Sequence, residues 1–128
     1  MKIDLTSVLV DDQEKALAFY TDILGFTKKT DMPMGAHKWL TVVSSDEPGA
    51  TELLLEPNAN PAAQVYQKAL FEQNIPATSF GVEDMEAEYE RLSGLGVRFP
   101  VTPKSEAWGS YAIFDDTCGN LISLHQQK

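Results

Sequence analysis

The side chains best suited to chemistry in this chain are two histidines and two glutamates. His37 precedes Trp39 by two residues, and Glu52 precedes Glu56 by four. Side chains an even number of residues apart on a β-strand point to the same face, so each pair would share a face. Imidazole and carboxylate groups are common metal ligands, which makes His37 and Glu56 weak metal candidates, with His125 as a conceivable further donor. The alternative is that His37 is a partly exposed strand residue near a turn and His125 a frayed terminal one.

Glu56 has a second interpretation of its own. It follows three leucines and directly precedes Pro57, which lacks an N–H group and so marks the end of a strand. Carboxylates at such ends usually lie in water, because glutamate is rarely buried without a partner. A solvated strand end therefore stands beside the ligand-binding hypothesis for this residue.

Aromatic side chains on predicted strands form the other candidate site. A ring at the border of a cleft can hold a flat or cationic ligand through stacking and cation–π attraction. A shift of one residue in strand phase turns a side chain to the opposite face, so core packing remains open for each of them. The candidates are Trp39, Phe80, Trp108 and Tyr111.

Other kinds of catalytic site are not indicated. The chain has no Ser-His-Asp arrangement and no glycine loop of the kind that cradles phosphate. Its single cysteine, Cys118, excludes an intramolecular disulfide and lies in the turn sequence DDTCGN, where a structural role is expected.

Composition restricts the partners. The 128 residues are 43% hydrophobic and 23% charged, as expected of one globular domain with a core. The formal net charge of -9 disfavours nucleic acid and anionic membrane, because phosphate groups would be repelled. A small molecule that is cationic or neutral fits better. Without a signal-like or membrane-length apolar stretch, a cytoplasmic location is expected.

The chain also repeats itself. Residues 12–26 and 84–97 are both helix-like and end in Leu-Gly-Phe and Leu-Gly-Val, and a tryptophan, an acidic turn with glycine and an apolar strand follow each. Internal repetition of this kind predicts two copies of one structural unit. The copies would be βαβββ modules at residues 1–57 and 76–126, joined by a helix at residues 60–73.

The elements within the modules follow from local signals. Asp11-Asp12, Asn60 and Asp84 are expected to cap the three helices, and Gly25 is expected to end the first in a left-handed conformation. Alternating and β-branched stretches predict the strands. These are residues 3–10, 26–30, 37–44, 51–56, 76–82, 97–101, 110–114 and 121–125.

Five short stretches of the sequence resemble those of the glyoxalase, bleomycin-resistance and ring-cleaving dioxygenase superfamily, also called vicinal oxygen chelate proteins. These stretches are Val10-Asp11-Asp12, Ala18-Phe19-Tyr20, Leu24-Gly25-Phe26, Phe114-Asp115-Asp116 and Gly119-Asn120. The resemblance implies an α+β fold in which two βαβββ modules form a curved, partly open sheet around a cleft. It also implies a homodimer, since many members are dimers.

For metal-using members, the resemblance implies four ligands, two from each module. The first-strand position of module one falls on Leu5, and its last-strand position falls on Glu56, with Glu52 on the same face not excluded. In module two, the corresponding positions fall near Ala77 or Thr78 and on Ser123. Only the carboxylate of module one is therefore retained, and one carboxylate beside apolar and hydroxyl side chains is a poor metal site.

The leading hypothesis is a small-molecule binding protein that uses no metal or other cofactor. Aromatic side chains would desolvate the ligand, and Glu52 and Glu56 would attract positive charge. The alternative is an enzyme, either a lyase or a dioxygenase, holding a divalent metal through an unconventional set around Glu56. A regulatory or interaction module is a third possibility, and the sequence leaves open whether the protein is an enzyme.

Overall fold

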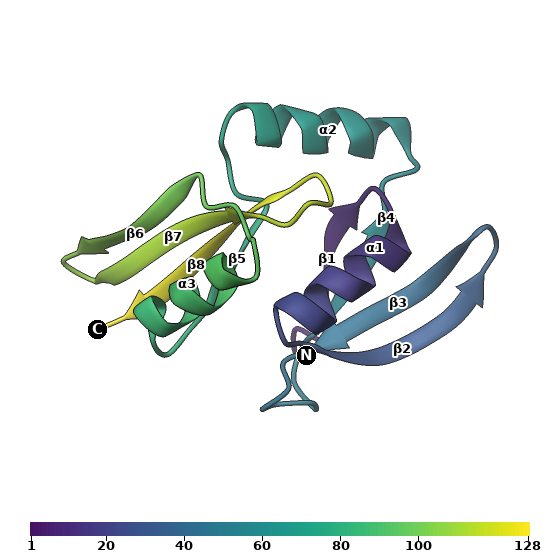
Figure 1. The fold of residues 1–128 in the computed structure, drawn as a ribbon. Coiled ribbons are helices and arrows are strands. Elements are labelled where there is room, and N and C mark those ends of the chain that lie inside the picture. The colour runs from purple at the N-terminus through teal and green to yellow at the C-terminus, as the bar shows by residue number, and fades with distance from the viewer. The chain divides into compact units, whose positions relative to one another are not determined.

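Each half of the chain folds into one βαβββ module. The computed structural model describes all 128 residues and divides into two compact units, Met1–Gln64 and Val65–Lys128 (Figure 1). The first unit contains β1 (Leu5–Val10), α1 (Gln13–Ala18), a π-helix (Phe19–Ile23), β2 (Thr27–Met34), β3 (His37–Val43) and β4 (Glu52–Pro57). The helix α2 (Pro61–Glu72) spans the boundary between the units. The second unit continues with β5 (Thr78–Gly81), α3 (Met85–Gly94), β6 (Val101–Glu106), β7 (Gly109–Asp115) and β8 (Leu121–Gln127).

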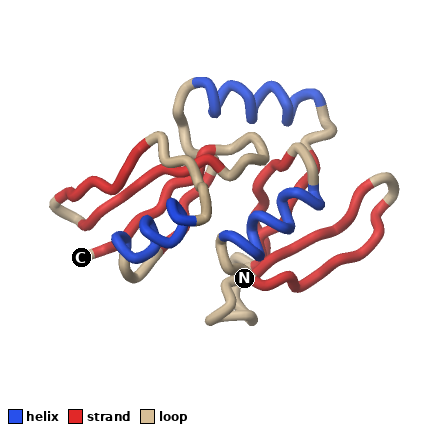
Figure 2. Tube along the Cα trace, in the orientation of Figure 1, coloured by secondary structure: helices blue, strands red, loops and turns tan.

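The two modules have the same sheet topology. Sheet A has the strand order β1-β4-β3-β2, and sheet B has the order β5-β8-β7-β6 (Figure 2). In each sheet the first and last strands of the module pair in parallel, and the other pairs are antiparallel. The α+β class and the repeated βαβββ order are confirmed. The strands form two open four-stranded sheets.

One face of sheet A is covered by α1 and the π-helix. The Gln13 side chain fixes this contact, because its Nε2 donates to the carbonyls of Lys38 (2.8 Å) and Leu55 (2.9 Å) while its Oε1 accepts from the Lys38 N–H (3.0 Å). One amide thus joins the helix to two strands and satisfies backbone groups that packing removes from water. The buried side chains of this face are Val8, Val10, Leu40, Val42, Leu53 and Leu55.

One face of sheet B is covered by α3 in the same way. Tyr89 of α3 makes an edge-on contact with Phe99 (ring centroids 4.9 Å apart), and Phe99 contacts Phe114 of β7. The α3 N-terminus is tied to the sheet because the Met85 N–H donates to Gln126 Oε1 (2.7 Å). The strand residues of this face are Ala112, Phe114, Ile122 and Leu124, all buried.

A buried carboxylate organises the β7–β8 turn. Asp116 accepts hydrogen bonds from the N–H of Cys118 (2.7 Å), the N–H of Asn120 (3.0 Å) and Asn120 Nδ2 (2.8 Å). Gln67 of α2 lies over the turn and donates to the Cys118 carbonyl and Asn120 Oδ1, both at 3.2 Å. A side chain at Gly119 would approach Gln67 Nε2 to 2.7 Å, so glycine is required beneath the helix. Cys118 is buried within the turn, as expected of a structural residue.

The helix signals read from the sequence are confirmed. Asp12 caps α1, Asp84 caps α3, and Asn60 Oδ1 accepts from the Ala62 N–H at the start of α2. Gly25 and Gly96 follow the two repeated helices with φ of 90° and 88°, in the left-handed region that ends a helix.

Two predictions for the second module are wrong. The strand expected at residues 97–101 begins only at Val101 and runs to Glu106. Pro100 has no N–H to give a ladder, and ladder pairing with β7 starts at the Val101–Ile113 pair. Helical spacing in the sequence also predicts a buried stripe of Met85, Tyr89, Leu92 and Leu95 in the second repeated helix. Leu95 is instead 52% exposed because the helix ends at Gly94.

The outer strands of both sheets are irregular. The register between β2 and β3 shifts between Lys28 and Thr30, and that between β6 and β7 shifts between Val101 and Lys104. Such bulges bend an edge strand and interrupt its ladder. No helix of the structure is both long enough and apolar enough to span a lipid bilayer.

Candidate functional site

The face of sheet A away from α1 carries the first group of candidates. Thr41 pairs directly with Leu54, and Trp39 and Glu56 lie two residues further along these strands, so all four side chains point to this face. We call it the open face because it lies away from α1, although Thr41 and Leu54 at its centre are buried. Trp39 pairs with Met32 of the edge strand β2, whose side chain is 53% exposed. The predicted shared face of Glu52 and Glu56 is what the strand register shows, and the register adds Trp39 to that face.

Glu52 is held in place on this face. Thr41, which is fully buried, donates from Oγ1 to Glu52 Oε1 at 2.7 Å, and its Oγ1 in turn accepts from the Thr30 N–H at 3.2 Å. A hydrogen bond to an ionised carboxylate is stronger than one between neutral groups. This chain of contacts therefore fixes one carboxylate oxygen of Glu52.

In the pairing of β1 with β4, the two glutamates have different neighbours on β1. Leu5 lies opposite Glu52, whereas Glu56 lies opposite Leu9. Of the two candidates for the last-strand ligand position, Glu52 is thus the direct neighbour of Leu5. Leu5 itself is 40% exposed and offers no electron pair to a metal.

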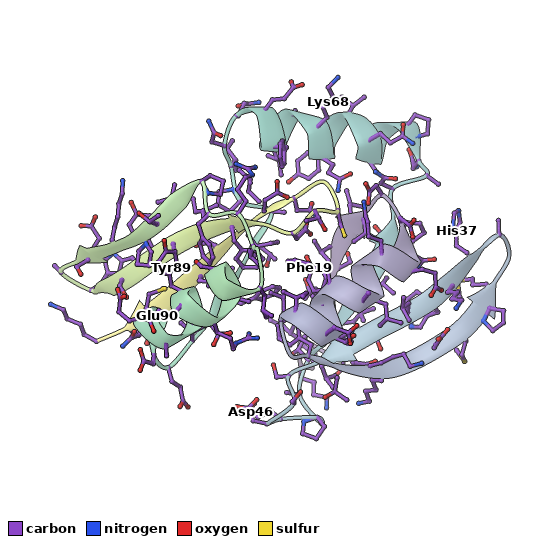
Figure 3. All side chains as sticks on the ribbon, in the orientation of Figure 1. Phe19, His37, Asp46, Lys68, Tyr89 and Glu90 are labelled. Atoms are coloured by element: carbon purple, nitrogen blue, oxygen red, sulfur yellow. The ribbon has the colours of Figure 1, made fainter.

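His37 lies at the start of β3 beside the β2–β3 hairpin (Figure 3). It is exposed and lines a cavity of about 320 Å³ together with Asp12, Gln13, Glu14, Pro33, Ala36 and Lys38. Nowhere in the structure do three histidine, cysteine, aspartate or glutamate side chains gather closely enough to hold a metal ion. The conceivable cluster of His37 with Glu52 and Glu56 is therefore not formed.

The same cavity wall holds an ion pair. Lys38 Nζ lies 2.8 Å from Glu14 Oε1 and 3.5 Å from Asp31 Oδ1. The pKa of Lys38 is raised above its ordinary value, first by the hydrogen bond to Glu14 and then by the charges of Asp31 and Glu14. Because these side chains are largely exposed, the pair is a weak contribution to stability.

The open face of sheet B carries the second group. Tyr111 of β7 lies opposite His125 of β8, and His125 Nδ1 is 2.8 Å from Ser79 Oγ on β5. Trp108 stacks on Tyr111 with ring centroids 6.3 Å apart and an interplanar angle of 25°. The sequence missed the Ser79–His125 contact, because the register of a parallel strand pair 46 residues apart leaves no local signal.

Two of the predicted aromatic residues are placed differently from expectation. Phe80 lies opposite Leu124 on the face covered by α3, so the structure does not bring it together with Tyr111. Trp108 lies in the β6–β7 turn, not on a strand, and is 51% exposed. Its indole reaches the open face through its stacking on Tyr111.

The positions that metal-using relatives would fill in module two also lack suitable donors. Ser123 lies opposite Ser79 on the open face, and Thr78 lies opposite Ile122 on the covered face. Ala77, which precedes Thr78, has an apolar side chain. With Leu5 in module one, the chain supplies one carboxylate and no imidazole at these positions, and this donor set does not fit a divalent metal.

Two open four-stranded sheets built from repeated βαβββ modules, each with aromatic side chains on the face away from its helix, define the class of protein. The chain belongs to the Glyoxalase/Bleomycin resistance protein/Dioxygenase superfamily, whose sequence profile matches residues 2–124. The resemblance inferred from the sequence is thereby confirmed.

Individual relatives extend over nearly the whole chain. YurT of Bacillus subtilis (strain 168), an uncharacterized protein, is 54% identical over 127 residues, which cover 99% of this chain and 100% of YurT. The crystal structure of UcmS2 is similar with a TM-score of 0.85 and 34% identity, covering 98% of this chain and 97% of UcmS2. TnmS3, described as an antibiotic binding protein from Streptomyces sp. CB03234, is similar with a TM-score of 0.80 and 31% identity, covering 100% and 97%.

Proposed function

We propose that this protein binds a small molecule on the open faces of its sheets, without a metal and without transforming the molecule. The observation that carries the proposal is the open face of sheet A, where Trp39 lies on the same side as Glu52 and Glu56. Glu52 is oriented by Thr41, as a preformed binding group would be. The likeness to TnmS3, described as an antibiotic binding protein, supports the same class of function.

The chemistry of the sheet A face favours an aromatic or cationic ligand. The Trp39 indole and the neighbouring Met32 and Met34 side chains provide apolar, polarisable surface for a flat ring. The carboxylates of Glu52 and Glu56 attract a positively charged group. In a protein of net charge -9, long-range attraction acts in the same direction.

A thermal-shift screen tests this proposal. Planar aromatic and cationic aromatic compounds are screened with EDTA, and in separate arms with nickel, zinc and iron. A ligand at one hundred times its dissociation constant stabilises the folded state by about 2.7 kcal/mol, which raises Tm by several degrees. We expect hits that persist in EDTA and that are weakened by Trp39→Ala and by Glu52→Gln. Asp46→Asn, in the exposed β3–β4 connection (Figure 3), is the matched control.

The opposite outcome points to an enzyme. If protein purified without chelator carries near-stoichiometric nickel, zinc or iron, and Glu52→Ala or Glu56→Ala removes it, metal-independent binding is wrong. A metal-dependent lyase or dioxygenase would then be the better description. A panel in which no compound stabilises the protein in any arm would argue against small-molecule binding.

A homodimer in the cytoplasm belongs to the same proposal. Exposed apolar side chains, among them Met32, Met34, Val65 and Tyr66, supply surface that a second copy could cover. The absence of a second cysteine fits a reducing compartment. Light scattering after size exclusion should give twice the chain mass of 14.1 kDa. The chain mass itself, at micromolar concentration, would contradict the dimer.

A further inference from the structure

The polar centre of the open face of sheet B is a serine–histidine contact. His125 Nδ1 and Ser79 Oγ are 2.8 Å apart, across the parallel pair of β5 and β8. Because Nδ1 is engaged, the ring orientation is fixed and the second nitrogen, Nε2, is the one available to another partner. His125 is half-buried, so its rotamer is further restricted by packing.

A glycine keeps that second nitrogen accessible. Gly81 lies directly opposite His125, and a Cβ built at Gly81 would lie 3.4 Å from Nε2. Any longer side chain at this position would occupy the space next to Nε2. Gly81 has no positive φ that would require glycine for the backbone. The absence of a side chain at Gly81 therefore serves to leave space next to His125 Nε2 on the surface of the sheet.

Two aromatic side chains and one lysine lie on the same face as this serine–histidine contact. Tyr111 is the cross-strand neighbour of His125, and Trp108 stacks on Tyr111. Lys104 of β6 lies opposite Tyr111 on the same face. The Trp108 turn is pinned in place, since the Lys128 N–H donates to the Trp108 carbonyl at 3.1 Å.

We propose that this face is a site for a planar aromatic ligand bearing an acidic oxygen group, a carboxylate or a phenolate. The ring stacks on Trp108 and Tyr111, and the anionic oxygen accepts a hydrogen bond from His125 Nε2, with Lys104 adding positive charge. The inference rests on the proposed small-molecule binding and goes further in naming the chemistry of one ligand class. It differs from the cation preference of sheet A, whose open face bears carboxylates.

The local charge supports this choice. The titratable groups on the same face of the strands beside His125 are Tyr111 on β7 and Lys104 and Glu106 on β6, while β5 carries only Ser79 and Gly81 there. Glu106 lies opposite Gly109, two residue pairs further along the β6–β7 ladder than Lys104.

Three probes with one ring and different head groups test the proposal. They are 2-naphthoate, 2-naphthalenemethanol and 2-naphthylmethylamine, titrated into ¹⁵N-labelled protein and followed by NMR. The chain has two tryptophans, and Trp39→Phe assigns the remaining indole N–H signal to Trp108. We expect 2-naphthoate to shift the Trp108 signal and to bind at this site about tenfold more tightly than the amine, as one charge-assisted hydrogen bond allows.

Variants separate recognition from folding. His125→Gln should weaken 2-naphthoate about tenfold, while 2-naphthalenemethanol changes by less than about twofold. Gly81→Val should weaken 2-naphthoate with His125 intact. Lys29→Gln, on the exposed part of β2, removes a charge elsewhere and is the control that should change nothing.

The results that overturn the inference are distinct from those that overturn the proposed function. If the three probes bind equally well at Trp108, or if His125→Gln leaves 2-naphthoate unchanged, the acidic-ligand site is wrong while small-molecule binding stands. Shifts confined to the Trp39 signal have the same meaning. If no probe shifts either indole, the inference also fails, and the wider proposal is then decided by the thermal-shift screen.

Discussion

Thr41 and Glu52 join the two central strands of sheet A through their side chains, with Thr41 Oγ1 donating to Glu52 Oε1 at 2.7 Å. The same hydroxyl oxygen accepts from the Thr30 N–H on the outer strand. One buried hydroxyl thus links three strands. The Glu52 carboxylate is therefore held by a hydroxyl that is itself tied to the outer strand.

Thr41→Val should therefore affect stability and binding together. Valine has nearly the same shape but leaves the Thr30 N–H without its acceptor and releases Glu52. We expect a loss of about 1–3 kcal/mol in the free energy of unfolding, measured by urea titration. Thr6→Val, at an exposed position of β1, should remain within about 0.5 kcal/mol of wild type. Equal values for the two variants would show that the buried contact adds nothing.

Gly109 should be the least replaceable glycine of sheet B. Its φ is +153°, and a Cβ there would lie 2.0 Å from the Gln126 carbonyl oxygen. Gly109→Ala must displace the β7–β8 pairing, so we expect a loss above about 2 kcal/mol and a changed Trp108 emission spectrum. Gly94→Ala is the matched control. Nothing lies within 4 Å of its Cβ position in α3, and helix propensity predicts a gain of up to about 1 kcal/mol.

Asp116 should be essential for the β7–β8 turn. Replacing it with alanine leaves the N–H groups of Cys118 and Asn120 without an acceptor in a buried setting. Thermal or urea unfolding of Asp116→Ala should show a loss of about 2–4 kcal/mol. Asp46→Ala, in an exposed turn, should change little. A similar loss in both variants would mean that charge alone, and not the turn contacts, matters.

Lys38 gives a prediction at alkaline pH. Its pKa is raised, chiefly by the Glu14 hydrogen bond, so the folded value lies above the ordinary 10.5 of an unfolded lysine. The stabilisation is therefore full below 10.5 and is lost as pH rises through the higher folded value. An NMR titration of Lys38 in Glu14→Gln should give a lower pKa than in wild type. Glu72→Gln, in α2, should leave the titration unchanged, and an unchanged pKa in both would refute the assigned cause.

Local sequence signals predicted most of the helices and strands, because the ends of helices and the alternation of strands depend on residues close together in the chain. Asp12, Asn60 and Asp84 cap helices through backbone groups two or three residues away, and the two modules follow from repetition of such signals. The shared face of Glu52 and Glu56 was predictable because the alternation within a strand is also local, whereas the position of Trp39 on that face depends on the pairing of β3 with β4. The ends of the strands and the register between them could not be predicted in this way.

Phe80 and Trp108 show why the remaining site could not be predicted. Which face Phe80 occupies depends on the phase of a four-residue strand, and a shift of one residue reverses it. Trp108 belongs to a turn whose place is set by Gly109 and by pairing with the chain end. The Ser79–His125 contact needs the register of two strands far apart in sequence, which only the folded chain supplies.

The irregular outer strands have a consequence for the behaviour of the protein at high concentration. β2 and β6 are sheet edges, and each combines a register shift with a proline and at least one lysine, Pro33 with Lys28 and Lys29 in β2 and Pro103 with Lys104 in β6. A further strand docking there would meet a missing N–H, a bent backbone and a charge that must be desolvated. These two edges are therefore protected against uncontrolled strand addition, the first step of aggregation into fibres.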